Sequence, residues 1–526
     1  MKSVMQHSFS QVPSAEIQRS SFDRSHGVKT TFDGGQLIPF FVDEVLPGDT
    51  FNCRTSGFAR LATPIYPVMD NMYLETFYFA VPLRLIWDNF QKMMGEQDSP
   101  GDSTDYIIPT VTSPDPGGYL ENSIFDYLGL PTKVPGLTHS ALFLRAYNLI
   151  WNEWFRDQNL QIPATVLTDD GPDDLSHYFM RKRGKRHDYF TSSLPWPQKG
   201  DAVDIPIGQS APVVSTGDNS PKFGSQDGTI TDNYLTMQSG GGIGYQPDTI
   251  LAVNPVVWND PSLEVDLSNA TAATINQLRQ AFQIQKMYER DARGGTRYTE
   301  IIRAHFNVLS PDARLQRPEY LGGGSTPINI TPIAQTAPDY QQQGEGSVGA
   351  LGGMGTTSFS GHGFSKSFTE HCIVMGFCNV RADLTYQQGL NRMWSRQDRL
   401  DFYWPALALL GEQEVLNKEI YAQGDAVPED DMVFGYQERY AEYRYKPSTI
   451  HGEFRSNAAQ PLDAWHLSQD FENLPTLSDE FIKDSPPIDR VIAVPSEPHF
   501  IADFYHKLRC ARPMPLFGVP GNIDRF

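Results

Sequence analysis

The chain has 526 residues and a mass of 59.0 kDa, enough to bury a large core without a disulfide or a structural metal. Its 63 acidic and 42 basic residues give a net charge of -21, which argues against a protein whose main task is to coat nucleic acid, because each neutralised phosphate needs a lysine or arginine. Hydrophobic residues at 39% and aromatic residues at 12% exclude a disordered chain.

The N-terminal segment and the cysteines indicate the compartment in which we expect the protein. The first 18 residues hold no apolar run of signal-peptide length, and no stretch reaches the roughly 18 apolar residues that a bilayer crossing needs. The cysteines form no CxxC pair, which speaks against a disulfide framework and a structural zinc. We therefore expect no membrane insertion, a reducing compartment and buried thiols at Cys53, Cys372, Cys378 and Cys510.

Strand-like segments open the chain. Residues 35–46, 50–61 and 72–83 are rich in β-branched and aromatic residues and are bounded by proline, glycine and aspartate, which predicts strands. Helical periodicity then appears over 143–155 and 274–292. We predict helices in both segments, and we expect them to serve as packing elements.

Two tracts between these elements have neither pattern. Residues 201–262 hold seven aspartates and a single lysine, which predicts an exposed, turn-rich excursion. Residues 321–363 contain eleven glycines and no lysine or arginine, and we expect a glycine-rich linker, arm or loop there. Long irregular segments of this kind are usually functional or disordered, and in an assembling protein they would be contact surface.

Strand patterns return in the last third of the chain. We predict strands over 370–385, 431–436, 489–494 and 499–509, and a third helix over 406–421 that Gly411 interrupts. Pairing of these strands with the early ones would make one β domain interrupted by insertions. The fold class predicted from the residues alone is therefore mainly β.

The motifs of common enzymes are missing from the sequence. No glycine run has the GxxxxGK[ST] pattern, and the sequence contains neither a GxSxG nor an HExxH motif. On a strand, His499 and Asp503 would share a face while His506 points away, which disfavours a metal triad. The acidic stretches 96–105 and 169–174 do not match a calcium loop, and we expect solvated loops. We predict no catalytic residues, no metal and no cofactor.

One short run of basic residues contrasts with the net negative charge of the chain. Residues 181–187 bring together Arg181, Lys182, Arg183, Lys185 and Arg186, and the aromatic pair 189–190 follows directly. Basic residues beside aromatic ones can follow the phosphates of a single strand while stacking its bases. We hypothesise a local nucleic-acid contact here, and equally that the run forms salt bridges with an acidic neighbour at a subunit contact.

Longer segments of the chain resemble a known family, the major capsid proteins of gokushoviruses, small icosahedral single-stranded DNA phages of the microvirus group. The resemblance spans nearly the whole chain and is weakest within 201–262 and 335–360. The segments that carry it are 22–51, 69–90, 182–200, 316–323, 384–415 and 441–456.

The resemblance implies a fold and an assembly. The fold would be an eight-stranded antiparallel viral jelly roll with long inserted loops and a few helices, formed as a single domain over 1–526. Sixty copies would form a T=1 icosahedral shell around a circular single-stranded DNA genome. The insertion 201–262 would protrude at each threefold axis and attach to the host, with Tyr234 and Tyr245 as candidate contacts.

The resemblance also implies partners. Sixty chains at -21 each sum to -1260, so a small basic viral DNA-binding protein is expected beside the shell. Viral scaffolding and pilot proteins and a host surface receptor, glycan or protein, complete the expected partners, and assembly would take place in the bacterial host cytoplasm. Local contacts to the genome would position it, and besides the basic run we nominate Arg19, Arg24 and Lys29.

A different class of function also fits the composition. Aromatic residues and carboxylates on a β scaffold describe carbohydrate-active and carbohydrate-binding proteins. A glycosidase would need two carboxylates about 5 to 9 Å apart across a cleft, which a sequence does not reveal. The leading interpretation remains a structural protein that assembles with copies of itself.

Overall fold

The computed structural model divides the chain into two compact units, which are described separately. Unit 1 comprises Met1–Pro197 and Leu309–Phe526, and unit 2 comprises Gln198–Val308. The residues that the structure describes are 18–201, 203, 213–215, 222–225, 233–237, 243–245, 256–258, 263–265, 275–295, 298–307, 316–336, 348–424 and 427–517.

Unit 1 is built on one antiparallel sheet. Its strands run in the order β1-β21-β4-β15-β14-β5-β16-β3, and β2 also pairs with β21. Asp23 of β1 lies opposite Arg509, and His26 of β2 lies opposite His506, so β1 and β2 follow each other in one register and the sheet has eight strand positions. The strands are β1 (Ser20–Asp23), β2 (His26–Phe32), β3 (Ile38–Val45), β4 (Thr50–Leu61), β5 (Met72–Pro82), β14 (Glu319–Ala334), β15 (Leu351–Ser367), β16 (Cys372–Ala382) and β21 (Phe500–Arg512).

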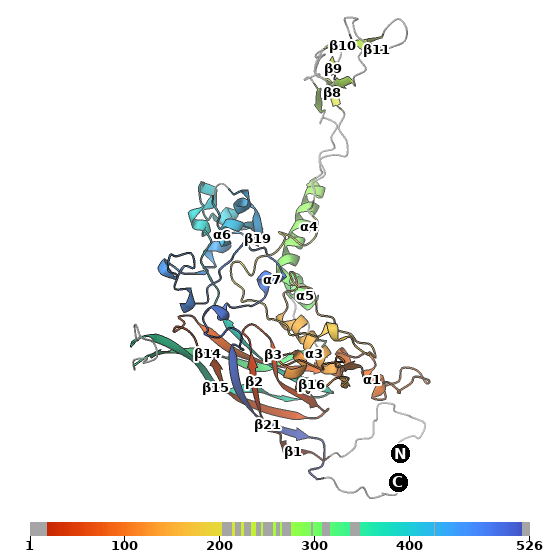
Figure 1. The fold of residues 1–526 in the computed structure, drawn as a ribbon. Helices are drawn as coiled ribbons and strands as arrows, with labels where there is room; N and C mark the ends of the chain where they lie inside the picture. The colour runs from red at the N-terminus through yellow and green to blue at the C-terminus, as the bar shows by residue number, and fades with distance from the viewer. Residues whose placement is uncertain are drawn as a thin grey trace. The chain divides into compact units, whose positions relative to one another are not determined.

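The sheet curls around a first hydrophobic core (Figure 1). Buried and exposed residues alternate along β4 and β21 with period two, because one side of these strands faces the core and the other faces solvent. The two ends of the sheet meet across the core, where the rings of Phe40 and Phe504 lie 4.8 Å apart. This sandwich is consistent with the predicted eight-stranded jelly roll and confirms a mainly β fold.

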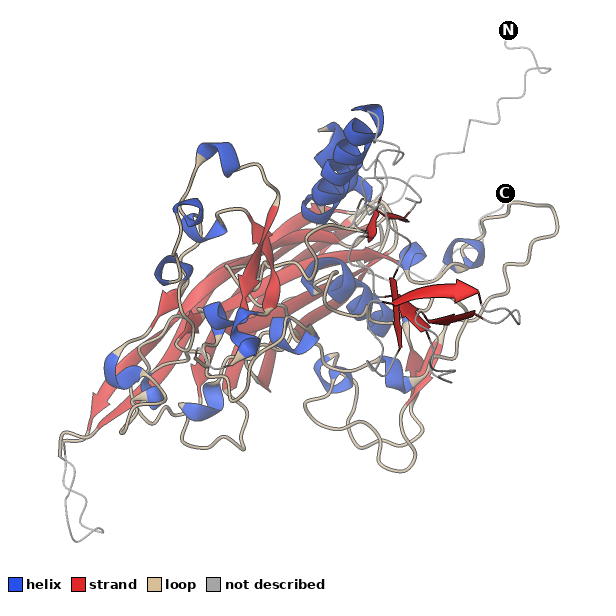
Figure 2. Ribbon diagram, turned by 90° about the horizontal axis from the view of Figure 1, so that it is seen from above, coloured by secondary structure: helices blue, strands red, loops and turns tan. Residues whose placement is uncertain are grey.

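A second core lies on the other side of β5 and β16, which are buried on both faces. Phe79 and Phe377 point into it, and Tyr147 of α3 (Leu142–Ile150) packs on Phe377 at 5.8 Å between ring centroids. A π-turn (Trp151–Phe155) extends α3, so the helix predicted over 143–155 is confirmed. Figure 2 shows short helices, in blue, lying over the red strands of the sheet when it is seen from above.

The glycine-rich tract 321–363 is not the linker, arm or loop that its composition predicts. Of its described residues, 321–334 lie in β14 and 351–363 lie in β15, which occupy the centre of the sheet, while 337–347 lie outside the described residues. A Cβ atom on Gly323 would overlap the carbonyl oxygen of Thr76, and one on Gly363 would overlap that of Cys53. The glycines therefore permit close approach of neighbouring strands.

Two further sequence predictions are wrong. The helix over 406–421 is a 3-10 turn (Pro405–Leu407), the strand β18 (Glu412–Leu416) and the short helix α6 (Asn417–Ile420), because β18 pairs with β19 (Val433–Glu438). The strand over 489–494 is a 3-10 turn (Ile488–Arg490) with one isolated bridge from Ile492 to Pro64. In both places tertiary pairing decides the local structure.

Smaller elements complete unit 1. β18, β19 and α7 surround a third core that includes Phe190, Phe434 and Phe481. The remaining short elements are α1 (Phe90–Met93), β6 (Thr110–Thr112), α2 (Ile124–Tyr127), β7 (Thr138–Ser140), β17 (Thr385–Tyr386), β20 (Ser448–Thr449), α7 (Asp479–Ile482) and 3-10 turns at Leu83–Leu85, Leu175–His177, Arg392–Trp394, Arg399–Asp401, Pro428–Asp431, Ala441–Tyr443, Gly452–Phe454 and Asp463–Trp465. The four cysteines are buried free thiols, as predicted.

Unit 2 contains the whole tract 201–262 together with two helices. Its sheet has the order β11-β10-β9-β12, and β8 pairs with β13. Helix α4 confirms the helix predicted over 274–292, and His305 of α5 contacts Asp291 of α4 at 2.6 Å. The elements are β8 (Val213–Ser215), β9 (Lys222–Ser225), β10 (Asn233–Met237), β11 (Ile243–Tyr245), β12 (Val256–Trp258), β13 (Leu263–Val265), α4 (Ile275–Gly294) and α5 (Tyr298–Phe306). Among the described residues, no helix combines the length and apolar character that a bilayer crossing requires.

Candidate nucleic-acid interface

The basic run 181–187 lies as an extended segment inside unit 1. The amide of Leu37 donates to the carbonyl oxygen of Arg181 at 2.9 Å, and the amide of Arg183 donates to that of Gly35 at 3.0 Å. On its other side, Gly184 forms a bridge with Lys483. The backbone of the run is therefore held between two other segments of the chain.

The side chain of Arg183 takes part in an ion-pair cluster. Its guanidinium pairs with one carboxylate oxygen of Glu75, whose other oxygen pairs with Arg381, and it lies 4.9 Å from the ring centroid of Phe77. Burial, and then the like charge of Arg183, lower the pKa of Arg381. Glu75 thus pairs with two cations, one on the extended segment 181–187 and one on β16.

Lys185 and Arg181 are also engaged internally. Lys185 is 8% exposed, and its ammonium lies 4.5 Å from the ring centroid of Phe481. Burial lowers the pKa of Lys185 to about 8, and burial raises the pKa of the nearby Asp484 to about 6. The guanidinium of Arg181 lies 3.9 Å from the ring of Phe179. A phosphate would have to displace these contacts to reach either side chain.

The remaining basic candidates also have partners within unit 1. In the run, Lys182 donates a hydrogen bond to Ser485 at 2.7 Å, and Arg186 pairs with Asp383 at 2.9 Å. Arg19 donates to the carbonyl oxygen of Gly48 at 2.7 Å. Arg24 pairs with Asp43 at 2.5 Å, and Lys29 pairs with Asp503 at 3.3 Å. The acidic partners belong to the same chain, which favours the salt-bridge interpretation in an intramolecular form. A nucleic-acid role for the run stays a prediction.

The acidic stretch 169–174 is the solvated loop that its composition predicts at five of its six positions, which are exposed, whereas Asp173 is buried. The side chain of Asp173 is fully buried and pairs with the fully buried Arg145, which Asp169 also contacts. The predicted separation of Asp503 and His506 is confirmed, since the first is exposed and the second is buried on the opposite side of β21. Across the described ranges, no group of three or more metal-ligating side chains converges.

A set of basic residues that sequence reasoning missed lies on the solvent side of the sheet. Arg54 and Arg60 on β4 and Lys507 and Arg509 on β21 are all exposed, and the register places Arg54 directly opposite Lys507. Their side chains make no hydrogen bond or ion pair to any other residue that the structure describes. The signal that could have revealed them is the period-two alternation within 50–61 and 500–512.

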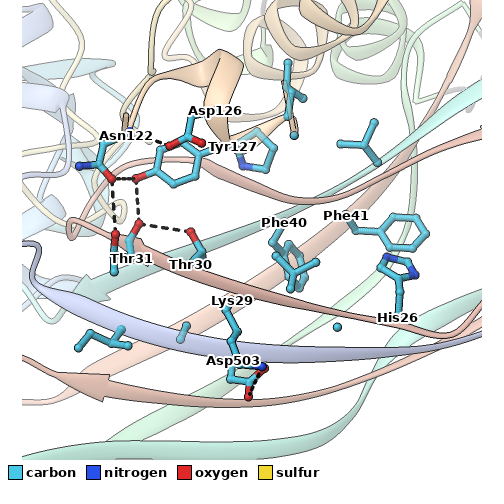
Figure 3. A pocket seen from close by; sticks show the side chains of 18 of the residues that line it. His26, Lys29, Thr30, Thr31, Phe40, Phe41, Asn122, Asp126, Tyr127 and Asp503 are labelled. Carbon is cyan, nitrogen blue, oxygen red and sulfur yellow. Dashed lines mark hydrogen bonds and ion pairs between the residues drawn. The ribbon is translucent and has the colours of Figure 1, made fainter. Parts of the chain in front are cut away.

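A cleft of about 940 Å³ opens beside these residues, where the edges of β2 and β3 face each other (Figure 3). The Tyr127 hydroxyl closes one end by donating to the carbonyl oxygen of Thr31 at 2.9 Å. Lys29 and Asp503 lie at its rim in Figure 3, and Arg60 also lines it. The cleft is therefore continuous with the exposed side of β4 and β21.

An antiparallel sandwich of eight strand positions with long insertions is the architecture of jelly-roll proteins, the class that includes viral capsid and lectin domains. Within that class, comparison with known proteins identifies the family: residues 10–522 match the family described as "Capsid protein (F protein)", and the chain belongs to it. This confirms the resemblance to the major capsid proteins of gokushovirus-type microviruses. The chain is a structural capsid protein, a component of the virion that assembles with copies of itself.

Three relatives match over almost their whole length. The chain is 51% identical to capsid protein VP1 of Bdellovibrio phage phiMH2K over 534 positions, covering 99% of this chain and 98% of the relative. It is 45% identical to capsid protein VP1 of Chlamydia phage 1, with the same coverage, and 35% identical to that of Spiroplasma virus 4, covering 98% and 97%. These names indicate a structural, non-enzymatic role, and none of them names a carbohydrate-active protein.

Proposed function

We propose that sixty copies of the chain form a T=1 icosahedral shell around a circular single-stranded DNA genome, assembled in the cytoplasm of a bacterial host. The observation that carries this proposal is the eight-position sandwich in a chain that matches the capsid family over 10–522. Long insertions between the strands supply contact surface, because a jelly roll presents its loops at both ends of the sandwich.

Electron microscopy and sedimentation of the purified protein test the shell. The chain is expressed with and without candidate viral partners. Closed particles of about 3.5 MDa before any genome, which is sixty times 59.0 kDa, support the proposal. Pieces that close only with a partner indicate dependence on scaffolding, whereas a monomer under every condition contradicts the proposal.

The net charge of the proposed shell indicates which partners it needs. A shell of sixty chains carries -1260, so it does not neutralise the phosphates of its genome. Cations and a small basic viral DNA-binding protein supply that charge, and scaffolding and pilot proteins act during assembly. Particles that retain DNA after removal of every other viral protein would contradict the need for a basic partner.

The insertion 201–262, which lies in unit 2, is the proposed host-attachment element. It has a sheet of its own, and the two tyrosine candidates lie on adjacent strands of it, since Tyr245 of β11 pairs with Leu235, the residue after Tyr234 in β10. The receptor is a host surface glycan or protein. Deletion of 205–260 is expected to spare assembly and abolish adsorption to host cells, and loss of assembly would instead make the tract structural.

A further inference from the structure

One face of the sheet differs in charge from the rest of the chain. We call it the β4–β21 face, and it consists of the exposed side chains that point away from the first core. It carries five basic and two acidic residues, a net charge of +3, in a chain whose total is -21. Its charged members are Lys29, Arg54, Arg60, Lys507, Arg509, Asp23 and Asp503.

The order of side chains along this face is basic, then aromatic, then basic. Arg54 faces Lys507 at one end, and Arg60 lies six residues further along β4, about 20 Å away at the rise of an extended strand. Between these ends lie Phe58 and Tyr505, which are 50% and 52% exposed. They are diagonal neighbours on adjacent strands, since Phe58 faces Asp503, and such positions lie about 7 to 8 Å apart, within reach of aromatic side chains.

Hydroxyl groups and an amide fill the positions between the charges. Ser56 lies opposite Ser360 of β15, and Asn52 lies opposite Ser365. Phosphate oxygens accept hydrogen bonds from such groups as well as from arginine and lysine. The helices α3, α6 and α7 all lie on the other side of the sheet from β21 in Figure 1, so they leave this face uncovered.

We propose that the β4–β21 face binds single-stranded nucleic acid, with the backbone along the basic residues and bases stacked on Phe58 and Tyr505. Charge complementarity selects this occupant, because Arg54, Arg60, Lys507 and Arg509 form no hydrogen bond or ion pair within the described residues. Asp23 lies opposite Arg509 and interacts electrostatically with Arg509 and Lys507, but one carboxylate does not balance four cations. Exposed aromatic rings beside unpaired cations form the platform that single strands use. The inference deepens the proposed function by naming the surface of the shell protein that faces the genome.

A second copy of this chain is a poorer occupant of the face. The centre of a subunit interface is depleted of charged residues, and lysine is disfavoured there. Here Lys29, Lys507 and three arginines are spread over the whole face, and unpaired arginines on both β4 and β21 would be desolvated in such a contact. A subunit contact is nevertheless an outcome that the test separates.

The first test removes charge. The variant Arg54→Gln, Lys507→Gln, Arg509→Gln is compared with Lys133→Gln, Arg399→Gln, Lys446→Gln, which changes the charge equally at exposed positions outside the face. Binding of a 20-residue oligothymidylate to the full chain is measured by fluorescence anisotropy from 0.05 to 0.3 M salt. Three lost phosphate contacts lower the slope of log K against log salt by about 2, and affinity at 0.1 M salt falls about 100-fold.

The second test removes stacking and restores charge. Phe58→Ser with Tyr505→Ser is expected to weaken binding roughly 5- to 150-fold for each base that loses its platform, with the salt slope unchanged. Asp503→Asn frees Lys29 and is expected to tighten binding about fivefold at 0.1 M salt, with a slope steeper by about 0.7. Asp105→Asn, at an exposed loop position, is its control.

Shell formation is measured on the same variants by electron microscopy. Closed particles with reduced nucleic acid in the triple variant, and normal content in its control, support the inference. Closed particles and unchanged oligothymidylate binding overturn it and leave the proposed capsid function intact. Loss of assembly with unchanged binding overturns it in favour of a subunit contact, and a monomeric parent chain contradicts the proposed function itself.

Discussion

The buried pair of Arg145 and Asp173 gives the sharpest test of what holds unit 1 together. All five guanidinium N–H groups of Arg145 are donated, at 2.5 to 3.1 Å, to Asp173, Asp169 and the carbonyl oxygen of Ile86. Burial opposes the charge of Arg145, but the hydrogen bonds and charge of Asp173 outweigh burial and raise the pKa of Arg145. The pair ties the loop 169–174 to α3 and so to the second core.

Arg145→Met is expected to lower the free energy of unfolding by about 3–5 kcal/mol, because it leaves the Asp173 carboxylate buried without its cation. Arg186→Met is the matched control: its partner is Asp383 and its side chain is 46% exposed, so a loss within about 1 kcal/mol is expected. Urea unfolding followed by tryptophan fluorescence reports the change, since Trp87 and Trp151 are buried in the second core.

A double variant checks the reasoning. Asp173→Leu added to Arg145→Met removes the lone charge, and part of the lost stability is expected to return because a hydrophobic replacement of a buried ion pair is often nearly neutral. Two results would contradict this reasoning: a free energy of unfolding for Arg145→Met equal to that of Arg186→Met, or a double variant no more stable than Arg145→Met. Either would show that the loss of stability does not come from leaving the Asp173 charge buried and unpaired.

Three other predictions concern the strands and the basic run. Burial, and then the charge of His26, lower the pKa of His506 to about 4, so only the unfolded chain takes up this proton between pH 6.5 and 4. As the pH is lowered across that window, the free energy of unfolding is expected to fall by about 3 kcal/mol. Urea unfolding of His506→Gln should show a correspondingly smaller fall. Gly363→Ala places a methyl group against the carbonyl oxygen of Cys53 and is expected to cost about 1–3 kcal/mol, whereas Gly352→Ala, with only one atom at 3.9 Å, should leave the melting temperature unchanged. Arg183→Gln is expected to lower the melting temperature, because Glu75 loses one of its two cationic partners. If the variant instead keeps its melting temperature but packages less nucleic acid, the run 181–187 binds the genome.

The hydrogen bonds around His506 explain why its neutral form is the folded one. Its Nε2–H donates a hydrogen bond to the carbonyl oxygen of Phe40 at 3.1 Å, because that oxygen can only accept. Nδ1 therefore accepts from the Thr55 hydroxyl at 2.9 Å. Tyr78 in turn contacts the Thr55 hydroxyl. A second proton on the ring would replace an acceptor by a donor in a buried chain of hydrogen bonds, which adds to the cost of charging the ring.

Strands with local signals were predictable from the sequence, and strands made by their neighbours were not. The segment 50–61 coincides with β4 because its alternation and bounding turns are both local. β14 and β15 were missed because glycine disfavours a strand in isolation, whereas in the sheet it permits close packing against β5 and β4. The helix expected over 406–421 failed for the same reason, since β18 forms only with β19.

In the candidate site, too, the local features were predictable from the sequence and the long-range contacts were not. The run 181–187 stands out because its charges are contiguous, yet Glu75, Asp383 and Phe481, which engage it, come from distant parts of the chain. The alternation within each strand marks the outward residues of the β4–β21 face, but Arg54 and Lys507 are separated by more than 450 positions, so the sequence does not show that they share one face. Only the register of β4 with β21 places them opposite each other.

Alternation on two strands lets this acidic chain carry a basic surface without weakening its core. The inward residues of β4 and β21, such as Phe51 and Phe504, fill the first core, while the outward ones are free to carry charge. With +3 on the β4–β21 face, the rest of the chain carries -24, since the total is -21. Under our proposal, the net negative charge elsewhere repels nucleic acid, which is held at one face of each copy by few contacts that salt weakens. In the sixty-copy shell that we propose, such contacts position the genome, and condensation is left to a basic partner.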